Sequence, residues 1–109
     1  MKRGDLVTIS LSGDYGKPRP AVIVETDKLV PSSHVVVCPG TSAIHEAAKV
    51  RRLLVVPDAV NNLRAPTQFQ IDRVTGVRRE TCGTVIGRLD SEAMQQFELQ
   101  LTLVLGLAD

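Results

Sequence analysis

The chain has 109 residues, 43% of them hydrophobic, which is enough for a single small domain over residues 1–109. Its formal net charge of +1 excludes a globally basic nucleic-acid-binding protein, so any anion site must be local. With no Trp, one Tyr and two Phe, the core must be aliphatic, and the chain lacks the aromatic platforms on which single strands usually stack.

The cysteine pattern and the hydropathy indicate a soluble, cytoplasmic protein. Cys38 and Cys82 have neither metal-site nor disulfide-framework spacing, so we expect both to be buried free thiols in a reducing compartment. No apolar run is long enough for a signal peptide or for a membrane span. A membrane is therefore not expected among the partners.

Alternating or β-branched apolar runs, bounded by Gly and Pro, predict six strands. They cover residues 6–11, 21–25, 34–38, 49–56, 67–77 and 83–87. Pro39-Gly40 is expected to close the third strand and Gly76 to bend the fifth. The segments between the strands, including residues 12–18 and 58–66, are predicted loops.

Residues 90–107 predict a C-terminal helix, with Asp90 or Ser91 as the N-cap and Gly106 at the end. The expected buried face is Met94, Phe97, Leu101, Val104 and Leu105. Leucines also alternate with period two at the end of this segment, which is the pattern of a strand. Its length, its cap and the lack of β-branching in its first half favour the helix. The helix end is apolar nearly all round, and a second copy of the chain is the simplest partner for it.

The run Lys17-Pro18-Arg19-Pro20 holds a cation on stiff backbone at the start of a predicted strand. Each proline fixes its own φ and disfavours helical geometry in the residue before it. A guanidinium held in this way suits bidentate capture of a phosphate or a carboxylate. The alternative is an arginine at the rim of the sheet, paired with a carboxylate of the same chain.

Several segments carry a family resemblance in their order and spacing. They are RGDLV (3–7), RPAVIV (19–24), VCPGTS (37–42), PTQ (66–68), IDRV (71–74), IGRLD (86–90) and LGL (105–107). Together they resemble the MazF/PemK family, the ribonuclease toxins of bacterial toxin–antitoxin pairs. The resemblance implies a mainly β chain with a C-terminal helix (α+β), folded as a small SH3-like or CcdB-like barrel. It also implies a homodimer, and inhibition by a cognate antitoxin that is a small acidic protein.

The same resemblance implies metal-independent, sequence-specific cleavage of single-stranded RNA, without a cofactor. In that reaction the 2′-OH attacks the adjacent phosphorus and leaves 2′,3′-cyclic phosphate and 5′-OH ends. By position, Arg19 and Thr41 match the catalytic Arg and Thr of the family. A guanidinium is a poor general base, so we expect Arg19 to stabilise charge on the phosphorus oxygens and Thr41 to hold one of them.

Four further residues are candidates for binding the RNA. They are Lys17, Ser42, Thr67 and Gln68. Two of them have a structural alternative: Ser42, with Thr41, could simply form a turn, and Gln68 could satisfy the end of the barrel. His45 is either an auxiliary acid or base or a solvated loop residue. The loop at 12–18 is short and carries only Asp14 where some members of the family have a Glu.

Two functions of other classes compete with the ribonuclease. One is a toxin resembling CcdB, which binds and poisons DNA gyrase through its C-terminal helix and has no nuclease site. The other is a catalytically inactive SH3-like interaction module. The RPA and PGTS segments, and the absence of Trp from the tail, favour the ribonuclease.

Overall fold

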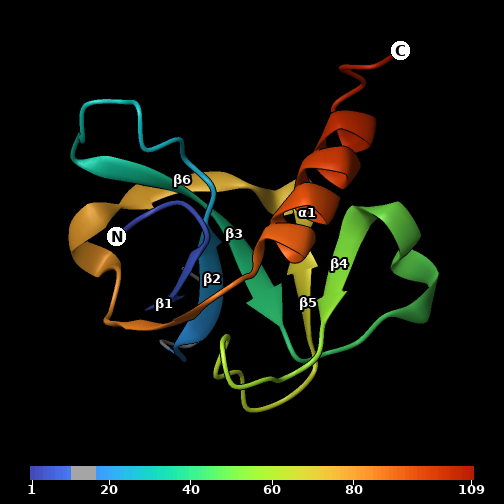
Figure 1. Ribbon diagram of the computed structural model, residues 1–109, viewed down its shortest axis with the longest axis horizontal. Helices are drawn as coiled ribbons and strands as arrows, with labels where there is room; N and C mark the ends of the chain where they lie inside the picture. Colours follow the sequence, from blue (N-terminus) through green and yellow to red (C-terminus); the bar gives the residue numbers. More distant parts are fainter. Residues whose placement is uncertain (11–16) are drawn as a thin grey trace.

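The computed structural model describes residues 1–10 and 17–109. In this part of the chain seven strands form one curled antiparallel sheet, a half-barrel, beside one C-terminal helix (Figure 1). The strands are β1 Asp5–Ile9, β2 Arg19–Ile23, β3 His34–Thr41, β4 Arg52–Val55, β5 Thr67–Gln70, β6 Thr75–Arg78 and β7 Val85–Arg88. The helix is α1 Ser91–Val104, and three 3₁₀ turns are η1 Glu46–Arg51, η2 Ile71–Arg73 and η3 Arg79–Thr81. The predicted class, mainly β with a C-terminal helix, is confirmed.

The sheet order is β4-β5-β3-β2-β1-β7, and β6 pairs with β3 outside this path. The long strand β3 therefore has two partners besides β2. Its first half, His34 to Val37, pairs with β6, and its last residues, Gly40 and Thr41, pair with β5. The sheet consequently divides at β3 into a β1-β2-β6-β7 part and a β4-β5 part.

Alternation along the strands gives the sheet two apolar faces and two cores. One core contains Leu6, Val22 and Phe69, and α1 covers it with Met94 and Phe97. Each of these larger side chains contributes about 1.5–3 kcal/mol on burial. The residues of the opposite parity form the second core, inside the curl of the sheet. These are Val7, Ile9, Ala21, Ile23, Val35 and Val37.

Local signals define both ends of α1. Of the two predicted N-caps the structure uses Asp90, whose Oδ1 accepts a hydrogen bond from the Ala93 N–H at 2.8 Å. At the other end Gly106 adopts φ +69°, and the N–H of Leu107 returns to the Thr102 carbonyl at 3.0 Å, which is a Schellman ending. Leu105, expected on the buried face, is instead 59% exposed, because the helix has ended before it.

Several strand predictions were wrong in their extent. The second strand covers Arg19–Ile23 instead of 21–25, and the last covers Val85–Arg88 instead of 83–87. The third strand continues through Pro39-Gly40 to Thr41. The fourth begins only at Arg52, since residues 49–51 belong to η1 and Lys49 has φ +50°. The predicted strand 67–77 is two strands, β5 and β6, separated by η2, and the bend lies there and not at Gly76.

Two smaller predictions concern the burial of the cysteines and the extent of the first strand. Cys38 is fully buried as expected, whereas Cys82 is only half-buried. The first strand ends at Ile9, and residue 11 of the prediction lies outside the described residues, as do Asp14 and residues 12–16 of the predicted loop. None of the helices in the described ranges has both the length and the hydropathy to cross a membrane.

Candidate active site

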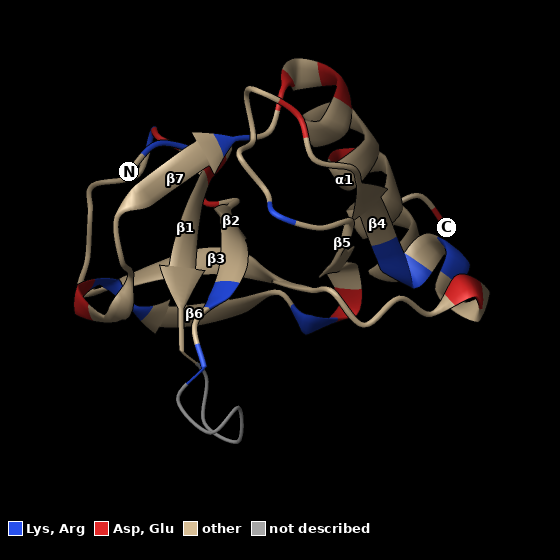
Figure 2. Cartoon of the chain, turned by 90° about the horizontal axis from the view of Figure 1, so that it is seen from below, with Lys and Arg blue, Asp and Glu red and all other residues tan. Residues whose placement is uncertain are grey.

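Arg19 is the first residue of β2, between Pro18 and Pro20 as the sequence analysis required. Its backbone pairs with Ile9 of β1, and its side chain is half-buried at the rim of the sheet. Among the described residues the Arg19 guanidinium has no carboxylate partner, since the four ion pairs of this part of the chain use other arginines. Figure 2 shows basic residues at the N-terminal ends of both β2 and β4. A preformed, uncompensated guanidinium at this place is suited to an anionic ligand.

The strand registers align three polar side chains across one face of the sheet. Ala21 of β2 pairs with Pro39 of β3, and Arg19 and Thr41 each lie two residues beyond that last pair, on the face that Ala21 and Pro39 share. Thr41 in turn pairs with Gln68 of β5. Arg19, Thr41 and Gln68 therefore lie on one face of the sheet, in the order β2, β3 and β5, and we call them the polar row.

Thr41 is half-buried, and its hydroxyl oxygen accepts a hydrogen bond from the Ala43 N–H at 3.1 Å. That bond fixes the side-chain rotamer and leaves the hydroxyl proton available for an oxygen of a ligand. Thr41 thus lies in a strand and also makes the turn-type bond that the alternative hypothesis anticipated. The two hypotheses for Thr41 are compatible.

Gln68 is 7% exposed, and both polar atoms of its amide are engaged. Its Oε1 accepts from the His45 N–H at 3.0 Å and from Arg52 Nη1 at 2.9 Å, and its Nε2 donates to the His45 carbonyl at 3.2 Å. The prediction that Gln68 contacts RNA remains untested. Its amide already forms hydrogen bonds within the protein, as expected under the alternative in which Gln68 pairs polar groups at the end of the barrel.

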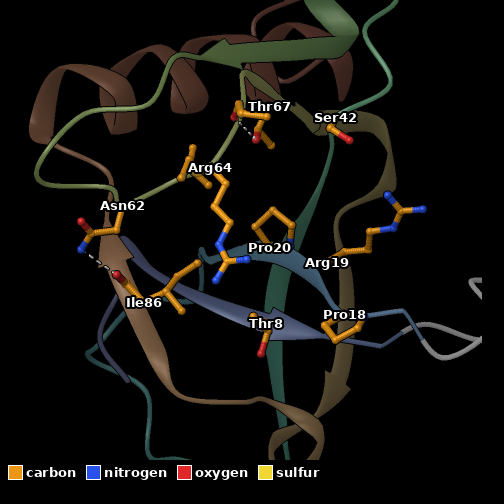
Figure 3. Close-up of a pocket in the computed structure, with 11 residues that line it drawn as sticks. Thr8, Pro18, Arg19, Pro20, Ser42, Asn62, Arg64, Thr67 and Ile86 are labelled. Atoms are coloured by element: carbon orange, nitrogen blue, oxygen red, sulfur yellow. Dashed lines mark hydrogen bonds between the residues drawn. The ribbon is translucent and has the colours of Figure 1, made fainter.

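A groove of about 770 Å³ adjoins the polar row at Arg19 (Figure 3). Its lining comes from Thr8, Pro18, Arg19, Pro20, Ser42, residues 62–65, Thr67 and Ile86. Thr8 and Pro20 alternate with Ile9 and Arg19, so the body of the groove is on the sheet face opposite to the polar row. Arg19 is at the border between them, and its guanidinium points away from the centre of the groove.

Arg64 is the residue of this groove that the sequence analysis did not single out. Its side chain extends from the 62–65 loop across the groove toward Pro20 and Thr8. In the described part of the chain it too has no ion-pair partner. A single arginine in a predicted loop carries no spacing signal, so only the fold reveals that it faces the same groove as Arg19.

The remaining predicted residues divide between the two faces. Ser42 and Thr67 line the groove, and the Thr67 hydroxyl donates to the Ala65 carbonyl at 3.0 Å on a side chain that is 4% exposed. Lys17 is exposed one residue before Pro18 and does not line the groove. His45 is exposed in the loop after Ser42, and its main chain is held by Gln68.

The buried cysteine and the possible metal ligands of the described residues add no further reactive site. Burial raises the pKa of the Cys38 thiol to about 12, and the negative charge of Asp72 acts in the same direction. A thiol of this kind stays protonated near neutral pH and is inert. Within the described ranges no three His, Cys, Asp or Glu side chains gather where they could hold a metal ion.

Comparison with known proteins identifies the family. The model of the family described as the PemK-like, MazF-like toxin of type II toxin-antitoxin systems matches residues 2–105. The chain belongs to this family. A relative, the probable endoribonuclease MazF of Mycolicibacterium smegmatis, is 33% identical over an alignment of 109 positions that covers 99% of this chain and 99% of the relative. The suspected MazF/PemK membership is thereby confirmed over nearly the whole sequence.

Solved structures of MazF/PemK-type toxins share the fold. The Mycobacterium tuberculosis toxin MazF-mt6 superposes with a TM-score of 0.78 at 21% identity, covering 94% of this chain and 96% of that one. An endoribonuclease in complex with its cognate antitoxin, from a mycobacterial species, gives 0.80 at 16% identity, covering 98% and 96%. MazF in a MazE–MazF complex of Deinococcus radiodurans gives 0.75 at 16% identity, covering 97% and 95%. The curled sheet with a C-terminal helix is thus the fold of this toxin family.

Proposed function

We propose that this protein is a metal-independent endoribonuclease toxin that cuts single-stranded RNA, above all mRNA, at a preferred sequence and so stops translation and growth. Membership of the MazF/PemK family supports this proposal, as does the close match to a probable endoribonuclease along the full length of both chains. The observation that carries it is geometric. Arg19, whose guanidinium is not ion-paired with any described residue, lines a groove and lies on the same face of the sheet as Thr41, at neighbouring strand ends.

The proposed reaction uses the RNA's own 2′-OH as the nucleophile. The 2′ oxygen bonds to the adjacent phosphorus and loses its proton to solvent or to a nearby base. The bond from phosphorus to the 5′ oxygen breaks, and that oxygen leaves after gaining a proton. The products are a 2′,3′-cyclic phosphate and a 5′-OH, with no water consumed. DNA has no 2′-OH and cannot follow this route.

Arg19 and Thr41 each have a role in this reaction. Negative charge grows on the phosphorus oxygens in the transition state, and preorganised donors aimed at that charge lower the barrier. The Arg19 guanidinium supplies two such donors, and it can also give a proton to the leaving 5′ oxygen. The Thr41 hydroxyl, whose oxygen already accepts the Ala43 N–H, donates its proton to one phosphorus oxygen.

The groove next to Arg19 is the proposed path for the RNA on one side of the cut. Arg64 crosses it and can neutralise a flanking phosphate, and Ser42 adds a hydroxyl at its edge. Lys17 extends the positive charge beyond Pro18. Because the chain offers few aromatic side chains, phosphate contacts are expected to provide most of the binding free energy.

The partners follow from the same proposal. A mycobacterial endoribonuclease of this fold has been solved with its cognate antitoxin, and a small acidic antitoxin is the corresponding partner here. We place the protein in the cytoplasm, where its RNA substrate is found, as a homodimer of one toxin domain. The exposed leucines at the end of α1 supply the apolar surface for that dimer.

The test is incubation of the purified protein with long single-stranded RNA in EDTA, followed by mapping of the cut sites and of the end groups. We expect cuts at one short sequence, ending in 2′,3′-cyclic phosphate and 5′-OH. Arg19→Ala should cut about 100- to 1,000-fold more slowly. Arg78→Ala is the matched control, since Arg78 is an exposed arginine of β6 in an ion pair with Glu80.

Absence of cleavage by the wild type across several RNAs would overturn the proposal. Binding of gyrase by that inactive protein would then favour the CcdB-like alternative. Cleavage that stops in EDTA and returns with Mg²⁺ would contradict the metal-independent step.

A further inference from the structure

The loop that joins β3 to η1 is held by two side chains from the neighbouring strands. Arg52 at the start of β4 donates from Nη1 to the Ala43 carbonyl at 3.0 Å and to Gln68 Oε1 at 2.9 Å. Gln68 of β5 binds the main chain of His45 through both ends of its amide. Arg52 and Gln68 together, which we call the loop clamp, thus fix residues 43 and 45 to the β4-β5 part of the sheet.

The loop clamp is connected to Thr41 through a single residue. The Ala43 N–H donates to the Thr41 hydroxyl oxygen at 3.1 Å, while the Ala43 carbonyl accepts from Arg52. A displacement of Ala43 would therefore remove the bond that sets the Thr41 rotamer. Gln68 also lies directly opposite Thr41 in the β3-β5 pairing, so one residue of the loop clamp is the cross-strand neighbour of Thr41.

The orientation of the Gln68 amide is fixed by its hydrogen bonds. Both lone pairs of Gln68 Oε1 accept hydrogen bonds, one from the His45 N–H and one from Arg52 Nη1. If the amide were flipped, its NH₂ group would face these two donors, which is unfavourable. Arg52 differs from Arg3, Arg51, Arg78 and Arg79, which have carboxylate partners among the described residues. Arg52 is half-buried, and the two oxygens that accept hydrogen bonds from its Nη1 are both neutral. These bonds orient the loop without neutralising the charge of Arg52.

We propose that Arg52 and Gln68 are positioning residues of the Arg19–Thr41 site: they hold the 43–45 loop so that the Thr41 hydroxyl donates toward the reacting phosphate. This inference rests on the proposed ribonuclease activity. It gives Gln68 a role through Thr41 instead of a direct contact with RNA. Since a displacement of about 1 Å at a catalytic group can cost about 100-fold in rate, a loosened loop should reduce the chemical step.

The test compares Gln68→Met, which keeps the side-chain length without its polar atoms, with Gln68→Glu, which keeps an acceptor for Arg52 and His45. Gln70→Met is the matched control, because Gln70 lies two residues further on the same face of β5 and is opposite Arg52. Cleavage of a short RNA is measured at saturating and at low RNA concentration. For Gln68→Met we expect kcat to fall about 10- to 100-fold with KM nearly unchanged. Gln68→Glu keeps an acceptor for Arg52 and the His45 N–H but loses the donor to the His45 carbonyl, so it should recover part of that loss. Gln70→Met should match the wild type.

A second readout needs no RNA. Hydrogen exchange at the His45 amide, whose acceptor is Gln68, should accelerate in Gln68→Met, while amides in the core strands β2 and β3 keep their protection. A uniform acceleration in every element would instead mark a general loss of stability and overturn the proposal. A raised KM with unchanged kcat would also overturn it, because that result indicates a direct contact with RNA.

Arg52 is tested by the salt dependence of RNA binding to Arg52→Gln. A positioning residue should leave the slope of log affinity against log salt unchanged, whereas a phosphate contact should reduce it by about one. If the wild type cuts no RNA, the proposed function fails and this inference fails with it. If the wild type cuts RNA and Gln68→Met cuts equally well, only the positioning role is wrong.

Discussion

Gly40 of β3 lies opposite Phe69 of β5 and leaves no room for a side chain between the two strands. A Cβ on residue 40 would come to 2.7 Å from Thr67 Cγ2 and 3.0 Å from Phe69 Cε1. The glycine therefore allows the side chains of Thr67 and Phe69 to pack over β3 at the last residues of the strand. The same β3-β5 pairing places Thr41 opposite Gln68, which is half of the polar row.

Gly40→Ala should destabilise the fold by about 1–3 kcal/mol, because an added methyl group in a close-packed place forces its neighbours to move. Chemical denaturation measures this change. Thr67→Ser removes the nearer of the two colliding groups, so the double variant should be more stable than Gly40→Ala alone. A Gly40→Ala protein as stable as the wild type would show that the Thr67 and Phe69 side chains can move aside without cost.

The same contact explains an error of the sequence analysis. Pro39-Gly40 predicts the end of a strand, since Pro lacks an N–H and Gly weakens a strand. In the fold, Pro39 still pairs with Ala21, and Gly40 is required by the neighbouring strand. The division of residues 67–77 into β5 and β6 has a similar cause, because the two segments pair with different parts of β3. Such pairings connect distant residues and leave no local signal.

The predictions for the two ends of α1 were correct. Asp90 caps α1 and Gly106 ends it, because both devices are complete within a few residues of sequence. The stiff Arg19 at the start of a strand could be recognised for the same reason. The loop clamp could not, since Gln68 and His45 are 23 positions apart in the sequence. Arg64 likewise acquires its place only when the 62–65 loop folds over β1 and β2.

Arg19→Ala and Thr41→Ala should each reduce RNA cleavage about 100- to 1,000-fold, the loss typical of a donor to transition-state charge. Toxicity in an expressing cell should be lost in both. The fold should survive, because neither side chain belongs to the two apolar cores. Single-turnover cleavage gives the rates, and circular dichroism reports the fold. A collapsed spectrum in either variant would assign that residue to stability instead of catalysis.

Arg64→Ala should weaken RNA binding and leave the rate at saturating RNA almost unchanged, because Arg64 is in the groove away from the Arg19–Thr41 pair. If Arg64 neutralises one phosphate, the slope of log affinity against log salt should decrease by about one. Binding of a non-cleavable RNA lacking the attacking 2′-OH measures this over a series of salt concentrations. Arg78→Ala serves again as the control for an exposed arginine. Equal slopes in wild type and Arg64→Ala would place the RNA elsewhere.

Stability should decline as pH rises above about 9 through the titration of Cys38. Burial raises the pKa of this thiol from its ordinary 9.0 to about 12 in the folded state. Between these values the unfolded chain has released the proton and the folded chain has not, so increasing pH favours unfolding. The stabilisation is complete below pH 9 and is lost as pH rises toward 12.

Cys38→Ala tests this linkage, since it removes the titrating group. Its unfolding free energy should decline less steeply than that of the wild type between pH 9 and pH 12, by up to about 1.4 kcal/mol per pH unit. Cys82→Ala is the comparison variant, because Cys82 is only half-buried and its pKa, though also raised by burial, is partly lowered by Arg79. Parallel pH profiles for the wild type and Cys38→Ala would contradict the assignment.

The exposed leucines of α1 should support self-association. Leu99, Leu103 and Leu107 recur every four positions from the middle of α1 to just past its end, and they are 54%, 52% and 73% exposed. A row of this kind on a soluble chain is expected to be covered by a partner. Leu103→Glu places a charge at its centre and should shift the mass in solution from dimer to monomer, as measured by light scattering. The control is Glu92→Leu, at an exposed position in the first turn of α1. Glu98 is avoided as a control position because it forms an ion pair with Arg3. A Leu103→Glu protein that remains dimeric would place the interface on another face of the molecule.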